Sequence, residues 1–578
     1  MRNWKTKLTL QIPNKNSTID AGLISIQRGI LQGDALSALW FCLSLNPLSE
    51  QLKVNDLGYH LNAEQYNCSH LFYMDDLKLY AETRKNLDRL LNTTETFSND
   101  IGMSFGLDKC KINGMKRGKW TEQEGYALNT NTSEHIEVMN INEKYKYLGI
   151  QQTTITKHKE VKELIKEKIK TRIQSLLKTK LSGINMTKAI NIYALSVATY
   201  TFGVIKWTKT DLQDLNRMIR TTNTRYKTHH PKSSMERFHL PRREGGRGFS
   251  DLETLHFKQI KKLREFFLEK SKQSQLHQAI SMSDKSFTPL NLSQDSISYA
   301  EPPNIQEKIQ NWISKPLHGK YPNLINQNHI DRNASLAWLN YGNIFPETEG
   351  FMTAIQDKVI ATRRYLKSII KDPSITDDRC RVCRSMSETI EHIISGCSPL
   401  ANNEYTRRHD NVAKIIYIHL LTQIAPNEPS CATPYYSFTP QPTHTTNSHI
   451  IYWNRSVITD RTIHHNKPDI ILVNLAEKTT YLIEISVPLA ENIDKKQKEK
   501  HQKYIPLQQE IKEIWKQEKV IVVPIIVGAT GEIPTSLTKS LEQIKIQTNA
   551  FIQIQKSVVL DTCAIVRKFL SSTINITI

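Results

Sequence analysis

The sequence has no apolar run long enough to cross a lipid bilayer. Its most apolar stretch, Val520 to Val527, is interrupted by Pro524, whereas a membrane-spanning helix needs about 20 apolar residues. The amino terminus also lacks the apolar segment of a secretion signal. We therefore expect a soluble, intracellular protein with no membrane partner.

Cysteine is scarce, with eight residues in a chain of 578, too few for a disulfide scaffold. Three of the eight lie near one histidine, which favours a metal site in a reducing compartment. Acidic residues are outnumbered, because 57 Asp and Glu face 77 Lys and Arg, for a net charge of +20. This excess favours nucleic acid as a partner, and the length indicates several domains.

Two adjacent carboxylates, Asp75 and Asp76, stand inside a short apolar stretch. The pattern predicts two short strands joined by a tight turn, with the acidic pair half-buried at its tip. An isolated Asp-Asp pair is more often a plain surface turn, because aspartate is favoured there. With apolar flanks, we expect the pair to hold Mg²⁺ (or Mn²⁺) against a phosphate.

The tetrapeptide Tyr-Met-Asp-Asp at 73–76 resembles the metal-binding turn of reverse transcriptases. Upstream of it, residues 27–37 precede a long apolar stretch; one reading is an ordinary loop that caps a buried helix. The same residues are similar to the nucleotide- and template-contacting motif of reverse transcriptases. That resemblance implies nucleotide or nucleic-acid binding by Arg28, Gln32 and Gly33.

Two further motifs follow in the order of the same family. Residues 101–110 resemble the next palm motif, which implies that Lys109 lies near the incoming nucleotide. Residues 145–150 resemble the primer grip of non-LTR (LINE-like) retrotransposon enzymes. Together the four motifs imply a partial reverse-transcriptase palm over residues 1–150.

One element of the family pattern is missing. A two-metal polymerase draws carboxylates from two places, and in this family the first comes from a strand upstream of the Gln-Gly motif. Residues 1–26 contain one acid, Asp20, in what looks like a turn. We therefore expect an N-terminally truncated chain whose first catalytic aspartate is absent and whose Asp75 and Asp76 do not support polymerisation alone.

The segment after the palm predicts a helical thumb over residues 151–250. Residues 157–180 are basic and place apolar residues at i+4 steps, which indicates an amphipathic helix, although a purely solvated helix has the same pattern. The apolar positions are Val161, Ile165, Ile169, Ile173 and Leu177. A helical linker region is expected over residues 251–370.

A glycine-rich loop at 237–249 carries three arginines that we expect to meet phosphates, namely Arg242, Arg243 and Arg247. The loop is also similar to a stretch that follows the thumb in retrotransposons with a restriction-like nuclease.

Three cysteines and a histidine form the best-defined metal motif of the chain: Cys380, Cys383, His392 and Cys397. Three thiolates and one imidazole satisfy tetrahedral Zn²⁺ and leave no open position, which predicts a structural zinc. The alternative is free buried cysteines beside a core histidine. We expect a small zinc knuckle within residues 371–440 that is too short to have its own core.

Two strands rich in Ile, Val and Leu are predicted at 467–473 and 480–487. If their hairpin centres between Ala476 and Glu477, Asp469 lies directly opposite Glu484. Two facing carboxylates in an apolar sheet are costly without a metal, so we expect them to hold Mg²⁺. The alternative is a lone pair of charges on an edge strand.

The segment 441–578 then resembles the PD-(D/E)xK restriction-like nucleases, with an α/β fold. The usual lysine is replaced by Ser486, and the retrotransposon group supplies it from the following helix. The resemblance implies that Lys500 positions or activates water and that Lys503 and Tyr504 contact nucleic acid, with Lys503 as the alternative catalytic lysine.

The sequence thus predicts a multidomain α+β protein similar to non-LTR retrotransposon polyproteins with a C-terminal restriction-like endonuclease. The resemblance implies RNA-directed DNA polymerase and endonuclease chemistry for target-primed reverse transcription, with target DNA and element RNA as partners and the nucleus as the site of action. A non-catalytic nucleic-acid-binding remnant is the alternative. The target site and the oligomeric state stay open.

Overall fold

The computed structural model describes residues 5–11, 18–26, 29–30, 33–61, 66–129, 134–153, 156–294 and 301–571. The chain forms two compact units. The first comprises residues 1–163, 201–206 and 258–299, and the second comprises 164–200, 207–257 and 300–578. The division falls within helices α3 (His158–Leu177) and α8 (Leu252–Lys270), so it cuts across the predicted segments 151–250 and 251–370.

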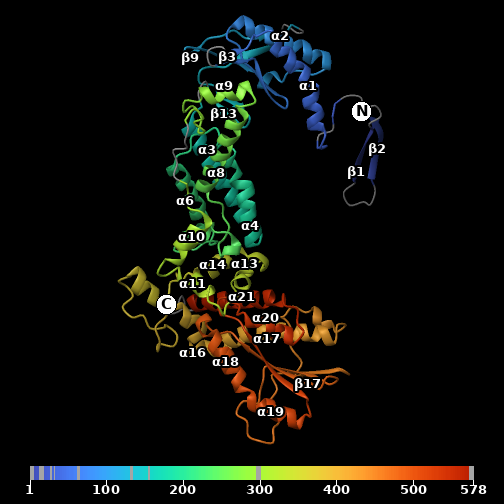
Figure 1. Cartoon of the computed structure of the whole chain (residues 1–578), viewed down its shortest axis with the longest axis vertical. Coiled ribbons are helices and arrows are strands. Elements are labelled where there is room, and N and C mark those ends of the chain that lie inside the picture. The colour runs from blue at the N-terminus through green and yellow to red at the C-terminus, as the bar shows by residue number, and fades with distance from the viewer. Residues whose placement is uncertain are drawn as a thin grey trace. The chain divides into compact units, whose positions relative to one another are not determined.

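The first unit is built from short strands around two long helices (Figure 1). Its elements are β1 (Lys5–Gln11), β2 (Thr18–Ser25), α1 (Ser37–Val54), β3 (Tyr59–Leu61), β4 (Tyr66–Cys68), β5 (His70–Tyr73), β6 (Asp76–Leu79), α2 (Arg84–Ile101), η1 (Leu107–Lys109), β7 (Lys111–Ile112), β8 (Gly114–Lys116), β9 (Lys119–Thr121), β10 (Tyr126–Ala127), β11 (His135–Val138), β12 (Tyr145–Tyr147), β13 (Ile150–Gln152) and α9 (Gln275–Ser283).

Helices α1 and α2 pack on the hairpin formed by β5 and β6. Leu48 and Leu52 of α1 and Leu90 of α2 are almost fully buried against partly buried hairpin residues such as Phe72 and Leu77. Helix α2 is well terminated: the Thr83 side chain accepts a hydrogen bond from the Asn86 backbone N–H at its start, and Gly102 adopts a left-handed conformation at its end. The apolar flanks of the acidic pair thus form a local core.

The second unit begins with helices and ends in a mixed α/β layer structure. Its helical first part contains α4 (Gly183–Ala189), η2 (Ile190–Ala194), α5 (Ser196–Thr199), α6 (Lys209–Arg225), α7 (Met235–His239), η3 (Arg242–Glu244), α10 (Ile305–Ile313), α11 (Lys320–Ile325), α12 (Arg332–Leu336), α13 (Trp338–Tyr341), α14 (Pro346–Gln356), α15 (Arg363–Tyr365), η4 (Leu366–Ile370), η5 (His392–Gly396), α16 (Ser398–Leu400) and η6 (Ala401–Tyr405).

The layered part follows from α17 onward. It contains α17 (Thr406–Ile424), η7 (Pro429–Ala432), β14 (Thr443–Thr445), β15 (His449–Trp453), β16 (Ile470–Asn474), β17 (Thr479–Ser486), η8 (Ala490–Asn492), α18 (Ile493–Lys503), α19 (Ile505–Ile514), β18 (Lys519–Ile526), α20 (Ser536–Gln543) and α21 (Ala550–Ser571).

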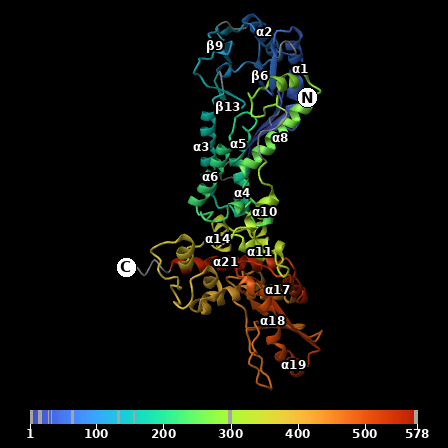
Figure 2. The ribbon, with the colours of Figure 1, turned by 60° about the vertical axis from the view of Figure 1, so that its left-hand side comes forward.

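A five-stranded sheet in the order β14-β15-β16-β17-β18 lies between two helical layers. The first four strands are antiparallel and β18 runs parallel to β17. Helices α17, α20 and α21 contribute buried residues to one face, and α19 covers the other (Figures 1 and 2). Alternate residues of β16 and β17 enter the two cores, as the period of two along a strand requires.

The amphipathic helix predicted at 157–180 is confirmed as α3. All five apolar positions at i+4 steps are buried. The helix is therefore not purely solvated, because its row of apolar side chains packs against other residues.

The Cys/His segment has no separate hydrophobic core among the described residues. Cys380, Cys397 and Ile390 belong to the same core cluster as Val559 and Phe569 of α21. This agrees with the expectation of a knuckle too short to have its own core: the segment packs into a core that it shares with other helices of the second unit.

Candidate active site and metal centre

The two acids predicted to face each other lie where β16 begins and β17 ends. Ile470 pairs with Ile483 and Asn474 pairs with Thr479, so the hairpin centres between Ala476 and Glu477 as predicted. The same register sets Asp469, one residue before β16, opposite Glu484. Glu484 is almost fully buried and Asp469 is partly exposed.

Each carboxylate already has a cationic neighbour. Lys500 of α18 places its Nζ 2.5 Å from Oε2 of Glu484. His409 of α17 places Nε2 3.1 Å from Oδ2 of Asp469, and the Ile485 backbone N–H donates to the same oxygen at 2.8 Å. The site therefore brings together four elements of the second unit: strands β16 and β17 and helices α17 and α18.

These contacts fix the charges of the site. Burial alone would raise the pKa of Asp469, but His409, the Ile485 N–H and the charge of Lys500 hold that pKa below its ordinary value. Burial alone would lower the pKa of His409, but Asp410 and Asp469 outweigh it and raise the pKa to about 9. At neutral pH the site thus contains an ionised Asp469 beside a protonated His409.

Solvent reaches the site through two cavities that both border His409. A cavity of about 430 Å³ is lined by Asp469, Asp410 and Trp453, among others. An open groove of about 1240 Å³ is lined by residues of α18, including Lys500 and Lys503. Asp469 and Lys500 are therefore accessible to solvent and small ions.

Tyr504 is not placed to contact nucleic acid. Its ring is buried in the core beneath α19, and its hydroxyl donates to the Lys467 carbonyl at 3.1 Å. Lys503 donates to the same hydroxyl at 3.0 Å. The expectation for Tyr504 is wrong because its side chain packs into the core on the α19 side of the sheet, while Lys503 lines the open groove.

His409 escaped the sequence reasoning. It lies 60 residues before Asp469 in the chain, and no periodicity links an α17 residue to a strand end. The adjacent His409-Asp410 pair, just after the Cys/His segment, was the signal available.

The predicted metal motif comes together in space. Among the residues that the structure describes, its members form the group of His, Cys, Asp and Glu side chains whose ligand atoms all lie within 4.8 Å of one another: Cys380, Cys383, His392 and Cys397. The Cys380 and Cys397 Sγ atoms are 3.9 Å apart, and Cys383 Sγ lies 3.3 Å from His392 Nε2. Tetrahedral zinc with Zn–S bonds of about 2.3 Å separates two sulfurs by about 3.8 Å, so the donors fit a tetrahedral cation.

This Cys/His cluster is fixed to the start of α17. The Tyr405 hydroxyl donates to the Ile393 carbonyl at 2.8 Å and accepts from the Cys397 N–H at 3.1 Å. Arg408 is buried and donates to the carbonyl of Ile394 and the hydroxyl of Thr562, both at 2.9 Å. The residue after Arg408 is His409, so the cluster and the acidic site share one helix start.

The acidic pair of the first unit is differently placed. Tyr73 pairs with Asp76, so the two-residue turn consists of Met74, with a φ of 56°, and Asp75. Both aspartates are exposed. The tip is thus one residue earlier than predicted. The expectation of a half-buried pair is wrong: both acids are exposed at the end of a hairpin that, among the described residues, pairs with no further strand.

The remaining predicted nucleotide-contacting residues lie in the same unit. Gly33 is exposed with a φ of 100°, and Lys109 is exposed at the end of η1. Arg28 and Gln32 fall outside the described residues.

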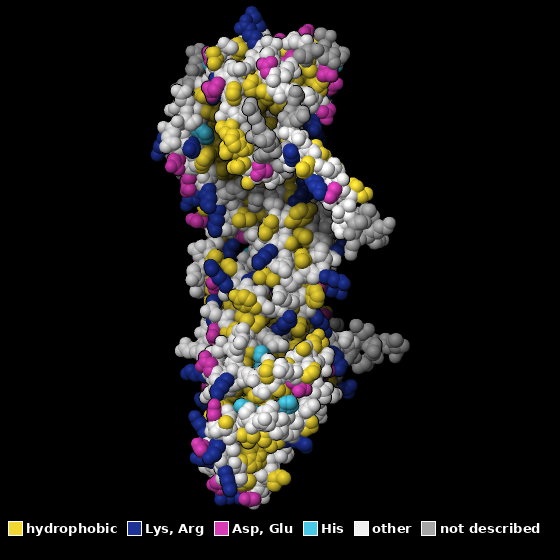
Figure 3. All heavy atoms as spheres, turned by 90° about the vertical axis from the view of Figure 1, so that its right-hand side faces the viewer, with side chains coloured by type: hydrophobic (Ala, Val, Ile, Leu, Met, Phe, Trp, Pro, Cys, Tyr) yellow, Lys and Arg dark blue, Asp and Glu magenta, His cyan; other side chains and the backbone are white. Residues whose placement is uncertain are grey.

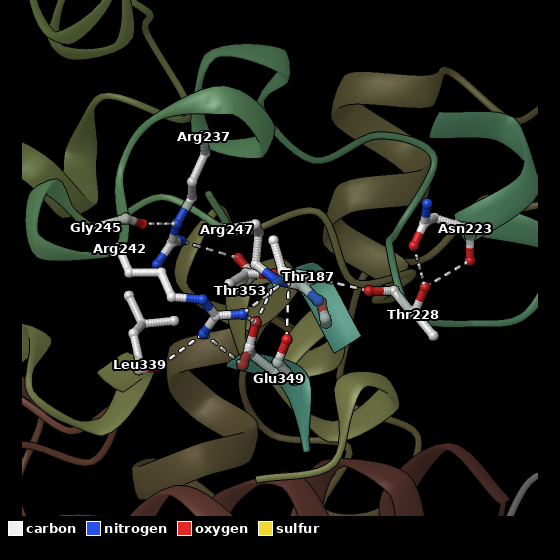
Figure 4. Close-up of polar contacts among 12 residues, drawn as sticks. Thr187, Asn223, Thr228, Arg237, Arg242, Gly245, Arg247, Leu339, Glu349 and Thr353 are labelled. Atoms are coloured by element: carbon white, nitrogen blue, oxygen red, sulfur yellow. Dashed lines mark hydrogen bonds and ion pairs between the residues drawn. The ribbon is translucent and has the colours of Figure 1, made fainter. Parts of the chain in front are cut away.

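Two of the three loop arginines predicted to meet phosphates are buried instead. Arg242 and Arg247 converge on the carboxylate of Glu349, with Arg242 Nη2 and Arg247 Nε at 2.8 and 2.5 Å from Oε1 (Figure 4). Arg247 also donates to the Thr228 carbonyl at 2.7 Å. The prediction failed because local sequence does not show that a distant glutamate on α14 neutralises the loop.

Arg243, the third arginine, has an exposed side chain. On the face drawn in Figure 3, Lys and Arg side chains are spread among acidic ones rather than gathered in one patch. Within the described part of the chain, no helix combines the length and the apolar character needed to span a membrane.

The first part of the chain is similar to known reverse transcriptases. Residues 2–152 match the family described as reverse transcriptase (RNA-dependent DNA polymerase). A retrovirus-related Pol polyprotein from the type-2 retrotransposable element R2DM of Drosophila melanogaster is 34% identical over 129 residues, covering 22% of this chain and 12% of that protein. The corresponding polyprotein from a type-1 retrotransposable element R2 of Nasonia vitripennis is 22% identical over 424 residues, covering 72% of this chain and 38% of that protein. The matches thus span well under half the length of these relatives.

Proposed function

We propose, from its kinship with the reverse transcriptases of non-LTR retrotransposons, that this chain carries a metal-dependent DNA-nicking site in its second unit. In this proposal the substrate is a DNA target in the nucleus and the second partner is element RNA. The polymerase region binds nucleic acid but does not extend a primer alone.

A single observation supports the nicking site most strongly. Asp469 and Glu484 stand opposite each other at one end of a buried sheet, and Lys500 reaches Glu484 from a neighbouring helix. Two carboxylates with a lysine are the groups that phosphodiester hydrolysis with magnesium requires.

In the proposed reaction, Asp469 and Glu484 would hold Mg²⁺, which supplies Lewis-acid stabilisation of the phosphate oxygens and of the attacking water. Lys500, whose Nζ lies beside Glu484, would orient or activate the attacking water. Half-buried Lys503, which lines the groove, would attract the DNA backbone.

The Cys/His cluster is proposed to hold a structural zinc ion. All four positions are protein ligands, so a bound zinc has no site for water. The zinc would fix the start of α17 through Tyr405 and Arg408.

A nicking assay tests the proposal. The full chain with bound zinc is incubated with supercoiled plasmid and Mg²⁺, and the nicked form is quantified. We expect nicking that is lost in Asp469→Ala with Glu484→Ala. Persistence of Mg²⁺-dependent nicking in that double variant would refute the assignment.

The polymerase expectation has its own test. Asp75 and Asp76 have no third ligand-bearing side chain grouped with them among the described residues, and two exposed acids hold cations weakly. We expect no primer extension on an RNA template. Extension that disappears with Asp75→Ala would show that the site is complete.

Two observations favour a second function, a non-catalytic nucleic-acid-binding protein. Lys500 and His409 already neutralise Glu484 and Asp469 without a metal, and the chain has a net charge of +20. A protein of this kind retards DNA in a gel and leaves supercoiled plasmid intact in the nicking assay.

A further inference from the structure

The Asp469 carboxylate is held by one of its two oxygens. Oδ2 accepts hydrogen bonds from His409 Nε2 at 3.1 Å and from the Ile485 N–H at 2.8 Å. No described residue donates to Oδ1. The two donors therefore fix the plane of the carboxylate and leave one oxygen free for a cation.

His409 is itself fixed on both sides. Its Nδ1 lies 3.1 Å from Oδ1 of Asp410, so both ring nitrogens face carboxylate oxygens and the ring cannot rotate without losing two hydrogen bonds. The preceding residue, Arg408, is buried and anchored to Ile394 and Thr562. The imidazole thus has a defined position relative to β16.

We propose that His409 is a positioning residue that orients Asp469 for cation binding, with Asp410 holding the imidazole in place. It touches neither the scissile phosphate nor the cation and acts through Asp469. This inference rests on the proposed nicking function and adds a residue to it that lies outside the strand pair and the following helix.

The physical reason is preorganisation. An aspartate at a strand end has free rotation about its side-chain bonds, and each cation-binding event would have to restrict it. Groups that hydrogen-bond to a metal ligand restrict it in advance, and their removal typically weakens metal affinity about 10- to 100-fold.

Three variants of the full chain with bound zinc test the proposal. His409→Ala removes both hydrogen bonds. His409→Gln retains an amide N–H near the position of Nε2 and serves as the conservative replacement. His419→Ala is the matched control, because His419 lies on the same helix and contacts Gln553 instead of the acidic site.

Two readouts are measured for each variant. The first is Mn²⁺ binding by titration calorimetry, with Asp469→Ala as the reference for loss of the site. The second is the rate of nicking as a function of Mn²⁺ concentration. It gives the half-maximal Mn²⁺ concentration and the maximal rate as separate quantities. Zinc content and thermal unfolding confirm that each variant is folded.

We expect His409→Ala to weaken Mn²⁺ binding and raise the half-maximal concentration by about 10-fold or more, with a smaller change in maximal rate. His409→Gln should recover most of the affinity, and His419→Ala should equal the unsubstituted chain.

The outcomes separate the two proposals. Unchanged Mn²⁺ affinity in a folded His409→Ala chain, when Asp469→Ala abolishes binding, overturns the role of His409 and leaves the nicking function standing. The role of His409 is also overturned if His409→Gln loses as much Mn²⁺ affinity as His409→Ala. The nicking function itself is overturned if the unsubstituted chain does not nick DNA and if Asp469→Ala leaves Mn²⁺ binding unchanged.

Discussion

Two pairs of carboxylates in this protein have opposite surroundings. Asp75 and Asp76 stand exposed on a hairpin of two strands. Asp469 and Glu484 stand at the end of a five-stranded sheet with helices on both faces, and each pairs with a cationic side chain. The difference lies in the number of elements that converge on the acids.

Convergence matters because a carboxylate becomes chemically useful when its orientation and charge are controlled. Exposed acids interact with water in many orientations, and salt screens their charges. Acids inside a layered fold keep one geometry, and nearby groups interact with them more strongly because the local dielectric is low. The four predictions below test this contrast.

Loss of the Cys/His cluster should have the largest effect. Cys397→Ser leaves three ligands, and structural zinc sites in small peptides contribute on the order of 10 kcal/mol, so we expect the second unit to lose several kcal/mol of unfolding free energy. Hydrogen exchange should rise in α17 and leave the β5–β6 hairpin unchanged. Equal increases of hydrogen exchange in α17 and in the β5–β6 hairpin would contradict the prediction that the Cys/His cluster stabilises the second unit alone.

Lys500→Met should have the second-largest effect, which is measured on the rate of nicking. Removing a group that orients the attacking water should lower the nicking rate by about 10²- to 10⁴-fold, the range for acid–base and positioning groups. Lys503→Met serves as the control, and its loss should stay under about 10-fold. A larger loss for Lys503→Met would assign the catalytic role to Lys503.

Glu349→Ala should destabilise the second unit by about 3 to 5 kcal/mol, because it leaves the buried Arg242 and Arg247 without a counter-charge. Chemical denaturation of the full chain measures the change. A matched control is Glu499→Ala, which removes a carboxylate from an exposed ion pair with Lys496 and should cost less than about 1 kcal/mol.

The smallest effect is expected for Asp76→Asn. An exposed acid on a two-stranded hairpin should change the unfolding free energy by less than about 0.5 kcal/mol and leave nicking unaltered. A change in the nicking rate above twofold would mean that the hairpin contributes to the second unit's chemistry, and the contrast between the two pairs would fail.

Several features could be predicted from the sequence because they depend on local spacing. The i+4 stripe of α3 is buried as expected, and the register that places Asp469 opposite Glu484 followed from a turn between Ala476 and Glu477. The spacing of the four Cys/His ligands likewise anticipated their approach in space. Periodicity and turn geometry act over a few residues, so they are readable without the fold.

The tertiary structure alone decided which polar groups face solvent and which are paired. Arg242, Arg247 and Tyr504 looked like nucleic-acid contacts, yet their partners or burial come from elements far along the chain. His409 reaches Asp469 across 60 residues for the same reason. The sequence determined where the acids of the strand pair would stand, whereas long-range packing determined their cationic neighbours, because charges are neutralised by proximity in space and not by order along the chain.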